Sequence, residues 1–301
     1  EKGYSIIDFK YKESSQKSRG ESVLNKKIGF IGCGNMARAI IAGIVSSGLC
    51  APENMIASNR TQPALDNIKE QYGIRTTTDN VQVAKEAEIL FLCVKPNVFE
   101  VVIPQIKNEV RQDTLIVSIA AGQTIHTIEE LFGGRDIKLV RVMPNTPALV
   151  AEAMSSISPN ANVTKEETVM VKDIFDHVGK AEIVDEKLID AVVGVSGSSP
   201  AYVYMFIEAM ADAAVSGGMP RAQAYKFAAQ AVLGSAKMVL ETGKHPGELK
   251  DMVCSPGGTT IEAVCALEER GFRDAVIAGT KACIAKSKEM SKENDERDRD
   301  Y

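Results

Sequence analysis

The sequence has 301 residues, of which 45% are hydrophobic and 25% charged, and a formal net charge of −5 at pH 7. The length suits about two domains of ~150 residues, and the composition is that of an ordinary globular protein. Nucleic acids and anionic membranes are bound by clustered Lys and Arg, and the sequence contains no dense basic block. Neither class of partner is therefore expected.

The cysteines and the two chain ends bear on the location of the protein. Six cysteines are scattered without a C-x-x-C pair: Cys33, Cys50, Cys93, Cys254, Cys265 and Cys283. Unpaired cysteines in apolar stretches favour a reducing, cytoplasmic location. Residues 1–25 are polar and lack the apolar core of a signal peptide, so we expect a disordered extension or an expression-tag remnant. Residues 291–301 are expected to form a solvated, charged tail.

Short apolar runs alternate with helical segments in the first half of the chain. The runs lie at residues 27–32, 54–59, 73–78, 88–94, 114–120 and 137–144. Strands that are apolar on both faces and alternate with helices indicate a parallel sheet covered on both sides. The predicted fold class is α/β, with a doubly wound, Rossmann-type parallel sheet over residues 26–184.

The second half has no strand pattern from Pro200 onward. Five successive segments have helical character, at residues 200–218, 220–243, 245–253, 258–271 and 272–290, and Gly and Pro mark the breaks between them. We therefore predict an all-helical domain over residues 185–290. Glu208 and Asp212 interrupt its longest apolar stretch, which favours a buried helix over a membrane span.

A glycine-rich motif follows the first apolar run. Residues 32–37 read G-C-G-N-M-A, which matches the G-x-G-x-x-A dinucleotide-binding pattern. In that pattern Gly32 permits a tight turn, Gly34 lets a pyrophosphate approach the backbone, and Ala37 lets helix and strand pack closely. Free N–H groups at the helix start then hold the phosphate. A plain turn is the alternative, but the alternating α/β context favours a dinucleotide site.

The end of the second apolar run indicates which dinucleotide is bound. NAD sites usually place Asp or Glu there to bind the ribose 2′-hydroxyl. This chain has Ser58-Asn59-Arg60 instead, and Arg60 offers a forked cation for a 2′-phosphate. A solvated turn Arg is the alternative. We predict NADP as the cofactor, with NADPH preferred and NADH possible.

Later loops carry further candidates. Ala120, Ala121 and Gly122 are small enough to let a nicotinamide ring lie against the backbone, and Lys95 is placed to contact a ribose or phosphate unless it is an ordinary loop charge. Ser198 or Ser199 is expected to cap the helix that begins near Pro200.

A second glycine-rich turn lies in the helical half. Gly257 and Gly258 precede a helix whose Thr259-x-x-Glu262 matches a capping box. Free N–H groups at such a helix start suit a small carboxylate, and a plain capped helix is the alternative. The three histidines, His126, His177 and His245, lack metal-ligand spacing, so we expect neither a metal site nor a catalytic histidine.

Taken together, seven segments resemble the motifs of the pyrroline-5-carboxylate reductase family, in the same order. They read FIGCGNMA, VKP, AAG, MPNTP, DAVVGVSGSSPAY, HPGELKD and SPGGTTIEA, and the resemblance runs from about residue 26 to 290. This family reduces the ring imine of 1-pyrroline-5-carboxylate with NAD(P)H to give L-proline, the last step of proline biosynthesis. The resemblance implies a Rossmann domain, a helical domain that interlocks with a partner's in a homodimer, and further assembly into a ring.

The resemblance also implies site residues by position. Cofactor contacts would come from Ile31, Gly32, Cys33, Gly34, Asn35, Met36, Asn59, Asn80, Cys93, Val94, Lys95, Pro96, Ala120, Ala121 and Gly122. Substrate contacts would come from Glu186, Ser255, Gly257, Gly258, Thr259 and Thr260. We expect Thr260 to be catalytic, because an imine nitrogen carries its own proton and a placed hydroxyl can replace a His or Lys acid. Ser199 and Met252 depart from the family pattern, which usually has Gly and in some members Asn there.

Two other functions stay open. A β-hydroxyacid dehydrogenase also joins a Rossmann domain to a helical one but needs a Lys in the latter, and neither Lys237 nor Lys250 lies in a matching glycine-rich frame. A non-catalytic NADP-binding regulatory module would bind the cofactor without turning over a substrate.

Overall fold

The computed structural model describes residues 24–297, with side chains up to residue 291. The extension predicted at residues 1–25 lies outside this range except for its last two residues. The described chain forms two compact units. The first contains the chain up to Gly197 and again from Ile284, and the second is Ser198–Cys283. The division at Gly197 lies inside the segment predicted to be the helical domain.

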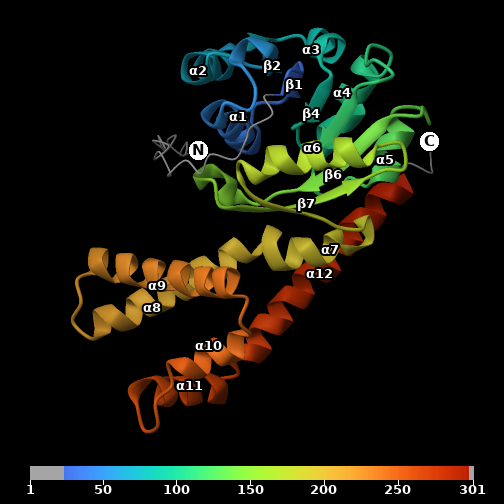
Figure 1. Ribbon diagram of the computed structural model, residues 1–301. Coiled ribbons are helices and arrows are strands. Elements are labelled where there is room, and N and C mark those ends of the chain that lie inside the picture. The colour runs from blue at the N-terminus through green and yellow to red at the C-terminus, as the bar shows by residue number, and fades with distance from the viewer. Residues whose placement is uncertain (1–23, 298–301) are drawn as a thin grey trace. The chain divides into compact units, whose positions relative to one another are not determined.

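The first unit is built on an eight-stranded sheet with the strand order β3-β2-β1-β4-β5-β6-β7-β8 (Figure 1). The strands are β1 Ile28–Ile31, β2 Met55–Ser58, β3 Arg75–Thr77, β4 Ile89–Leu92, β5 Leu115–Ser118, β6 Lys138–Met143, β7 Ala153–Pro159 and β8 Gly179–Ile183. The first six pair in parallel. Each lies within one of the six apolar runs, which confirms the predicted doubly wound sheet.

The last two strands depart from the parallel pattern. Strand β7 runs antiparallel to β6, with Val140 opposite Pro159, and β8 runs parallel to β7. The chain turns back after β6 through the short 3-10 segment η3 Thr146–Val150. A parallel neighbour would need a crossover of a dozen or more residues, so this short connection produces an antiparallel pair.

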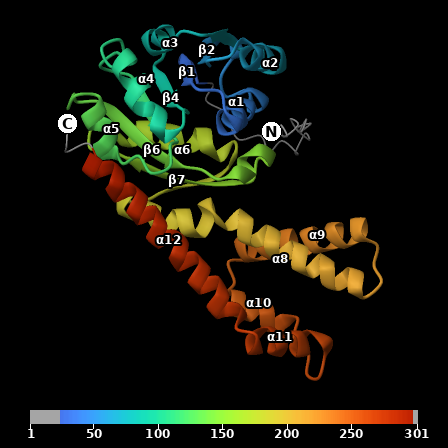
Figure 2. The same cartoon turned by 180° about the vertical axis from the view of Figure 1, so that it is seen from behind.

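Helices cover both faces of the sheet. They are α1 Asn35–Ser47, α2 Gln62–Tyr72, α3 Asn80–Glu86, α4 Phe99–Ile106, α5 Ile125–Leu131 and α6 Lys165–Asp176. Side chains of α1, α2 and α6 share one core cluster, in which the rings of Phe30 and Phe91 stack at 4.7 Å. Side chains of α3, α4 and α5 share the other, and Figure 2 shows α4 and α5 in front of the sheet.

Short helical turns complete the first unit after β8. They are η4 Glu186–Leu188, α7 Ile189–Val192 and the π-helical turn η5 Val193–Gly197. The side chain of Asn145 donates a hydrogen bond to the carbonyl of Ser196, and Ser287 Oγ donates to Asp190 Oδ1 at 2.6 Å. The second bond ties α12 Phe272–Arg297 to α7. Helix α12 continues beyond residue 290 into the predicted charged tail.

The second unit consists of helices alone. It contains α8 Ser199–Ser216, α9 Arg221–Thr242, α10 Pro246–Met252, α11 Thr259–Glu269 and the first part of α12, as the five helical segments predicted. Few of its side chains are buried. Met205, Phe227 and Leu240 are 69%, 67% and 78% exposed. Apolar faces of this extent are typical of a protein–protein interface.

The start of α8 differs from the prediction made from the sequence. The predicted serine cap of α8 is wrong: Ser198 holds the N-cap position but makes no side-chain capping bond. Its backbone is already helical, with φ −101° and ψ −19°, because η5 runs directly into α8. Ser198 Oγ instead accepts a hydrogen bond from Cys283 Sγ.

Between residues 24 and 297, no helix combines the length and hydropathy needed to cross a bilayer.

Candidate functional site

The register of four neighbouring strands defines one edge of the sheet. Ile31 lies opposite both Ser58 and Leu92, and Leu92 lies opposite Ser118, so β2, β1, β4 and β5 end level with one another. The loops that follow these strands carry most of the predicted cofactor residues, at 32–36, 59–60, 93–96 and 120–122. The structure therefore brings these residues to the carboxyl edge, where doubly wound sheets bind their ligands.

Asn80 joins this edge from another element. It is the first residue of α3, and its Oδ1 atom accepts a hydrogen bond of 2.7 Å from Ser58 Oγ. Its Nδ2 atom donates to Gln105 Oε1. The side chain is thus fixed beside the end of β2, a placement that the pattern of residues alone did not indicate.

The two glycines of the first loop are required for different reasons. Gly32 has φ +93°, and a Cβ there would lie 2.9 Å from Val94 Cγ1 and 3.0 Å from the Cys93 carbonyl oxygen. Gly34 has φ −72° and ψ 179°, which any residue adopts, and a Cβ there would meet no atom within 4 Å. The backbone itself requires Gly32. Open space above Gly34 fits a ligand that approaches the backbone, which is the role expected for a pyrophosphate.

The start of α1 suits an anion. Gly34 is its N-cap and supplies no side-chain cap, and the first turn contains no acidic residue. The first N–H groups of a helix have no partner within the helix and carry the positive end of its dipole. This helix start can therefore hold a phosphate of the cofactor.

Two thiols of the cofactor loops, those of Cys33 and Cys93, carry no charge near neutral pH. Burial raises the pKa of the Cys33 thiol to about 11, although the nearby Arg38 guanidinium acts in the opposite direction. Burial also raises the pKa of Cys93, and the neighbouring Cys33 adds to this effect. Both thiols stay protonated, so neither places a negative charge where a phosphate would bind.

The remaining cofactor candidates are exposed or belong to tight turns. Arg60 and Lys95 are exposed, and Lys95 directly precedes the 3-10 turn η2 Pro96–Val98. Gly122 has φ +75°, and Ala120 is buried beside it. The 120–122 loop thus carries only small side chains of its own, as the nicotinamide hypothesis requires.

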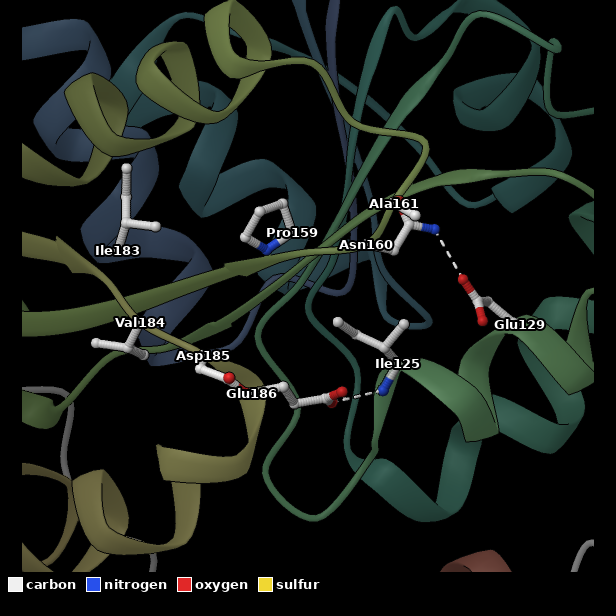
Figure 3. A pocket seen from close by; sticks show the side chains of 9 residues that line it. All are labelled: Ile125, Glu129, Pro159, Asn160, Ala161, Ile183, Val184, Asp185 and Glu186. Atoms are coloured by element: carbon white, nitrogen blue, oxygen red, sulfur yellow. Dashed lines mark hydrogen bonds between the residues drawn. The ribbon is translucent and has the colours of Figure 1, made fainter.

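Glu186 is held by a buried arginine. Its Oε1 atom accepts one hydrogen bond of 2.8 Å from Arg141 Nη1 and another of 2.7 Å from the backbone N–H of Ile125, the first residue of α5 (Figure 3). The Arg141 side chain is only 6% exposed. Sequence reasoning missed Arg141, although a lone Arg inside the apolar run of residues 137–144 was a signal for a buried partner.

A hollow of about 600 Å³ adjoins Glu186 on the first unit. Figure 3 shows Ile125 and Glu186 on one side of it and Pro159 and Asn160 on another. Pro159 lies opposite Val140, near the beginning of β6. This hollow therefore extends away from the carboxyl edge that carries the cofactor loops.

The predicted substrate loop belongs to the second unit. Gly257 has φ +66°, and the Gly258 N–H donates to the Ser255 carbonyl oxygen at 3.1 Å. The capping box expected at Thr259 and Glu262 is wrong, because Gly258 is the N-cap of α11 and Thr259 is already its first helical residue. Without a capping side chain, the first N–H groups of α11 remain available to an anion.

The predicted site residues thus divide between the two units. The cofactor candidates and Glu186 lie in the first unit, and the loop with Ser255, Gly257, Gly258, Thr259 and Thr260 lies in the second. Thr260, in the first turn of α11, is half-buried, whereas Thr259 is exposed. Across the described side chains, no three His, Cys, Asp or Glu residues are grouped as metal ligands.

Both halves of the chain match models of known protein families. The family model for pyrroline-5-carboxylate reductase dimerisation matches residues 186–290, and a model described as NADP oxidoreductase coenzyme F420-dependent matches residues 27–122. The pyrroline-5-carboxylate reductase of Escherichia coli K12 is 56% identical over 269 residues, which cover 89% of this chain and all of that protein.

Solved structures agree with these matches. A pyrroline-5-carboxylate reductase from Coxiella burnetii superimposes with a TM-score of 0.84 and 36% identity, over 88% of this chain and 98% of that one. The Plasmodium falciparum pyrroline carboxylate reductase, solved with NADP bound, gives 0.79 and 33%, over 89% and 98% of the two chains. From its sequence, its fold and its near full-length likeness to these enzymes, the chain belongs to the pyrroline-5-carboxylate reductase family.

Proposed function

We propose that this chain reduces the ring imine of 1-pyrroline-5-carboxylate to L-proline, the last step of proline biosynthesis, with NADPH as the preferred hydride donor. The observation that carries the proposal is the 56% identity to the Escherichia coli reductase over that enzyme's full length. This identity favours a reductase over a β-hydroxyacid dehydrogenase or a non-catalytic NADP-binding module. Oxidation of NADPH with pyrroline-5-carboxylate, beside reduction of NAD with 3-hydroxyisobutyrate, tests the choice directly.

Residues 26–184 are proposed to bind the cofactor, which supplies the hydride when bound. The start of α1 would hold the pyrophosphate, Asn80 and Arg60 would hold the adenosine end, and the 120–122 loop would lie against the nicotinamide. The relative from Plasmodium falciparum was solved with NADP bound, which supports the cofactor class. The absence of a carboxylate in Ser58-Asn59-Arg60 supports the preference for NADPH.

Residues 185–290 are proposed to bind the substrate. The uncapped N–H groups at the start of α11 suit a carboxylate, and the Thr260 hydroxyl in the same turn would donate a hydrogen bond to the ring nitrogen. Glu186 Oε1 already accepts two hydrogen bonds, so Oε2 is the oxygen atom left for a substrate contact. An imine nitrogen is basic enough to be protonated itself, which explains how reduction proceeds without a His or Lys acid.

The match of the dimerisation model to residues 186–290 supports a homo-oligomer. We propose a homodimer formed through the exposed apolar side chains of α8, α9 and α12, with dimers assembling into a larger ring. The location proposed is the cytoplasm, which the six free cysteines support.

The first prediction separates the two glycines of the cofactor loop. Gly34→Ala should raise the Kd for NADP by at least about tenfold while leaving the thermal midpoint unchanged, because its Cβ meets only the ligand. Gly32→Ala should lower the free energy of unfolding by ~2 kcal/mol, because φ +93° strains any side chain. Calorimetric titration and thermal unfolding measure the two effects, and a destabilised Gly34→Ala would contradict the assignment.

The second prediction concerns Arg60. Arg60→Ala should raise KM for NADPH about tenfold and leave KM for NADH nearly unchanged, because a charge-assisted contact to the 2′-phosphate is worth at least ~1.5 kcal/mol. Steady-state kinetics with both cofactors test this. Equal losses with NADPH and NADH would show that Arg60 does not read the 2′-phosphate.

The third prediction compares two adjacent threonines. Thr260→Ala should lower kcat/KM by ~10²-fold, the low end for a positioned proton donor, while Thr260→Ser keeps most activity. The Kd for NADPH should not change in either variant. Thr259→Ala is the comparison: Thr259 makes no capping bond, so stability should not change, and its backbone N–H stays in place, so activity should fall much less than in Thr260→Ala. A dead Thr259→Ala beside an active Thr260→Ala would mean that the roles are reversed.

The fourth prediction concerns assembly. Phe227→Lys should dissociate the oligomer into monomers with little activity, because it places a charge in an apolar interface. Val101→Lys is the matched control, since Val101 is 60% exposed on α4 in the first unit. Light scattering after gel filtration measures the mass. A wild-type protein that is monomeric and fully active at micromolar concentration would disprove the dimer.

A further inference from the structure

Arg38 bridges the cofactor loop and the second helix. It lies in the first turn of α1, where its Nε atom donates to the Cys33 carbonyl oxygen at 3.4 Å. Its Nη1 atom donates to Asn67 Oδ1 on α2 at 2.7 Å. The guanidinium is therefore held in place from two sides before any ligand binds.

The charge of Arg38 is not neutralised by either contact. Both acceptors are neutral amide oxygens, and no carboxylate of the described residues forms an ion pair with Arg38. Arg75 and Arg111, by contrast, each pair with a carboxylate. Arg38 therefore keeps a positive charge that no carboxylate pairs with, and an anionic ligand could bind to it.

The contacts of Cys33 show where that anion would lie. Cys33 Sγ donates to the Ser58 carbonyl oxygen at 3.3 Å, and the Gly32 N–H donates to the same oxygen at 3.0 Å. The residue that anchors Arg38 thus packs against the last residue of β2. This is where Rossmann sites place the 2′ position of the adenosine ribose.

We propose that Arg38 is a second specificity-determining cation for the 2′-phosphate of NADP, oriented by Asn67. The inference rests on the NADPH preference proposed above and adds a residue that the sequence pattern did not identify. Arg60 is exposed and must be ordered when the cofactor binds. Arg38 is already ordered by Asn67, so it loses less side-chain freedom on binding.

Calorimetric titration with NADP and NAD, which differ only in the 2′-phosphate, tests the proposal without turnover. Arg38→Gln should raise the Kd for NADP about tenfold and the Kd for NAD less than about twofold. Asn67→Ala should also weaken the binding of NADP relative to NAD, by about two- to threefold, since it loosens Arg38 without removing its charge. Arg111→Gln is the control, because Arg111 is an exposed arginine paired with Asp113, and it should change neither Kd.

Three results would overturn the proposal. In the first, the ratio of the Kd for NAD to the Kd for NADP stays unchanged in Arg38→Gln and falls in Arg60→Ala. This result would leave the NADPH preference intact and assign it to Arg60 alone. Equal weakening of NADP and NAD would place Arg38 at the pyrophosphate or in the fold, and thermal unfolding would distinguish these two. A wild-type protein that binds NADP and NAD equally would remove the NADPH preference itself.

Discussion

The level ends of β2, β1, β4 and β5 are the constraint on which the cofactor site depends. Four loops separated by many residues in the chain meet because Ser58, Ile31, Leu92 and Ser118 occupy one register. Parallel pairing allows little slippage here, since each strand is buried on both faces and a shift by one residue would exchange its two sets of side chains. The hydrophobic core and the binding edge are therefore specified by the same residues.

The ion pair between the buried Arg141 and the half-buried Glu186 joins this edge to the segment that follows the sheet. Glu186 binds both the strand residue Arg141 and the first N–H of α5, so one carboxylate fixes η4 against the helix that begins just after the 120–122 loop. Removing Glu186 would leave the charge of the buried Arg141 side chain without its carboxylate partner, which is unfavourable. We infer that the pair keeps the start of the helical segment in a fixed relation to the cofactor loops within the first unit.

Most of the fold was predictable because the strong signals are local. Residues 89–92, Ile-Leu-Phe-Leu, are apolar on both faces, and such a run has few alternatives to a buried strand. Strands β7 and β8 lie outside the six predicted runs. Strand β7 reads Ala-Met-Ser-Ser-Ile-Ser-Pro, which has no apolar run to mark it, and its antiparallel direction depends on the short connection after β6. The prediction that Thr259 caps α11 was wrong because the pattern gives the residue types but not the position at which the helix begins. Arg38 was missed because its role depends on α2 approaching α1, a tertiary contact that no local pattern reports.

Several helices of the described chain begin with a side-chain cap, whereas the two helices proposed to bind ligands do not. Asp79, Thr124 and Thr164 cap α3, α5 and α6 with their side chains. The helices proposed to receive a phosphate and a carboxylate, α1 and α11, begin instead at Gly34 and Gly258, which cannot cap. Glycine at an N-cap costs only a few tenths of a kcal/mol relative to Ser or Asp, yet it leaves the N–H groups unoccupied and lets an anion come close. A capping side chain at position 34 or 258 would compete with the ligand for these N–H donors. Ligand binding at the starts of α1 and α11 is therefore compatible only with a slightly less stable helix start.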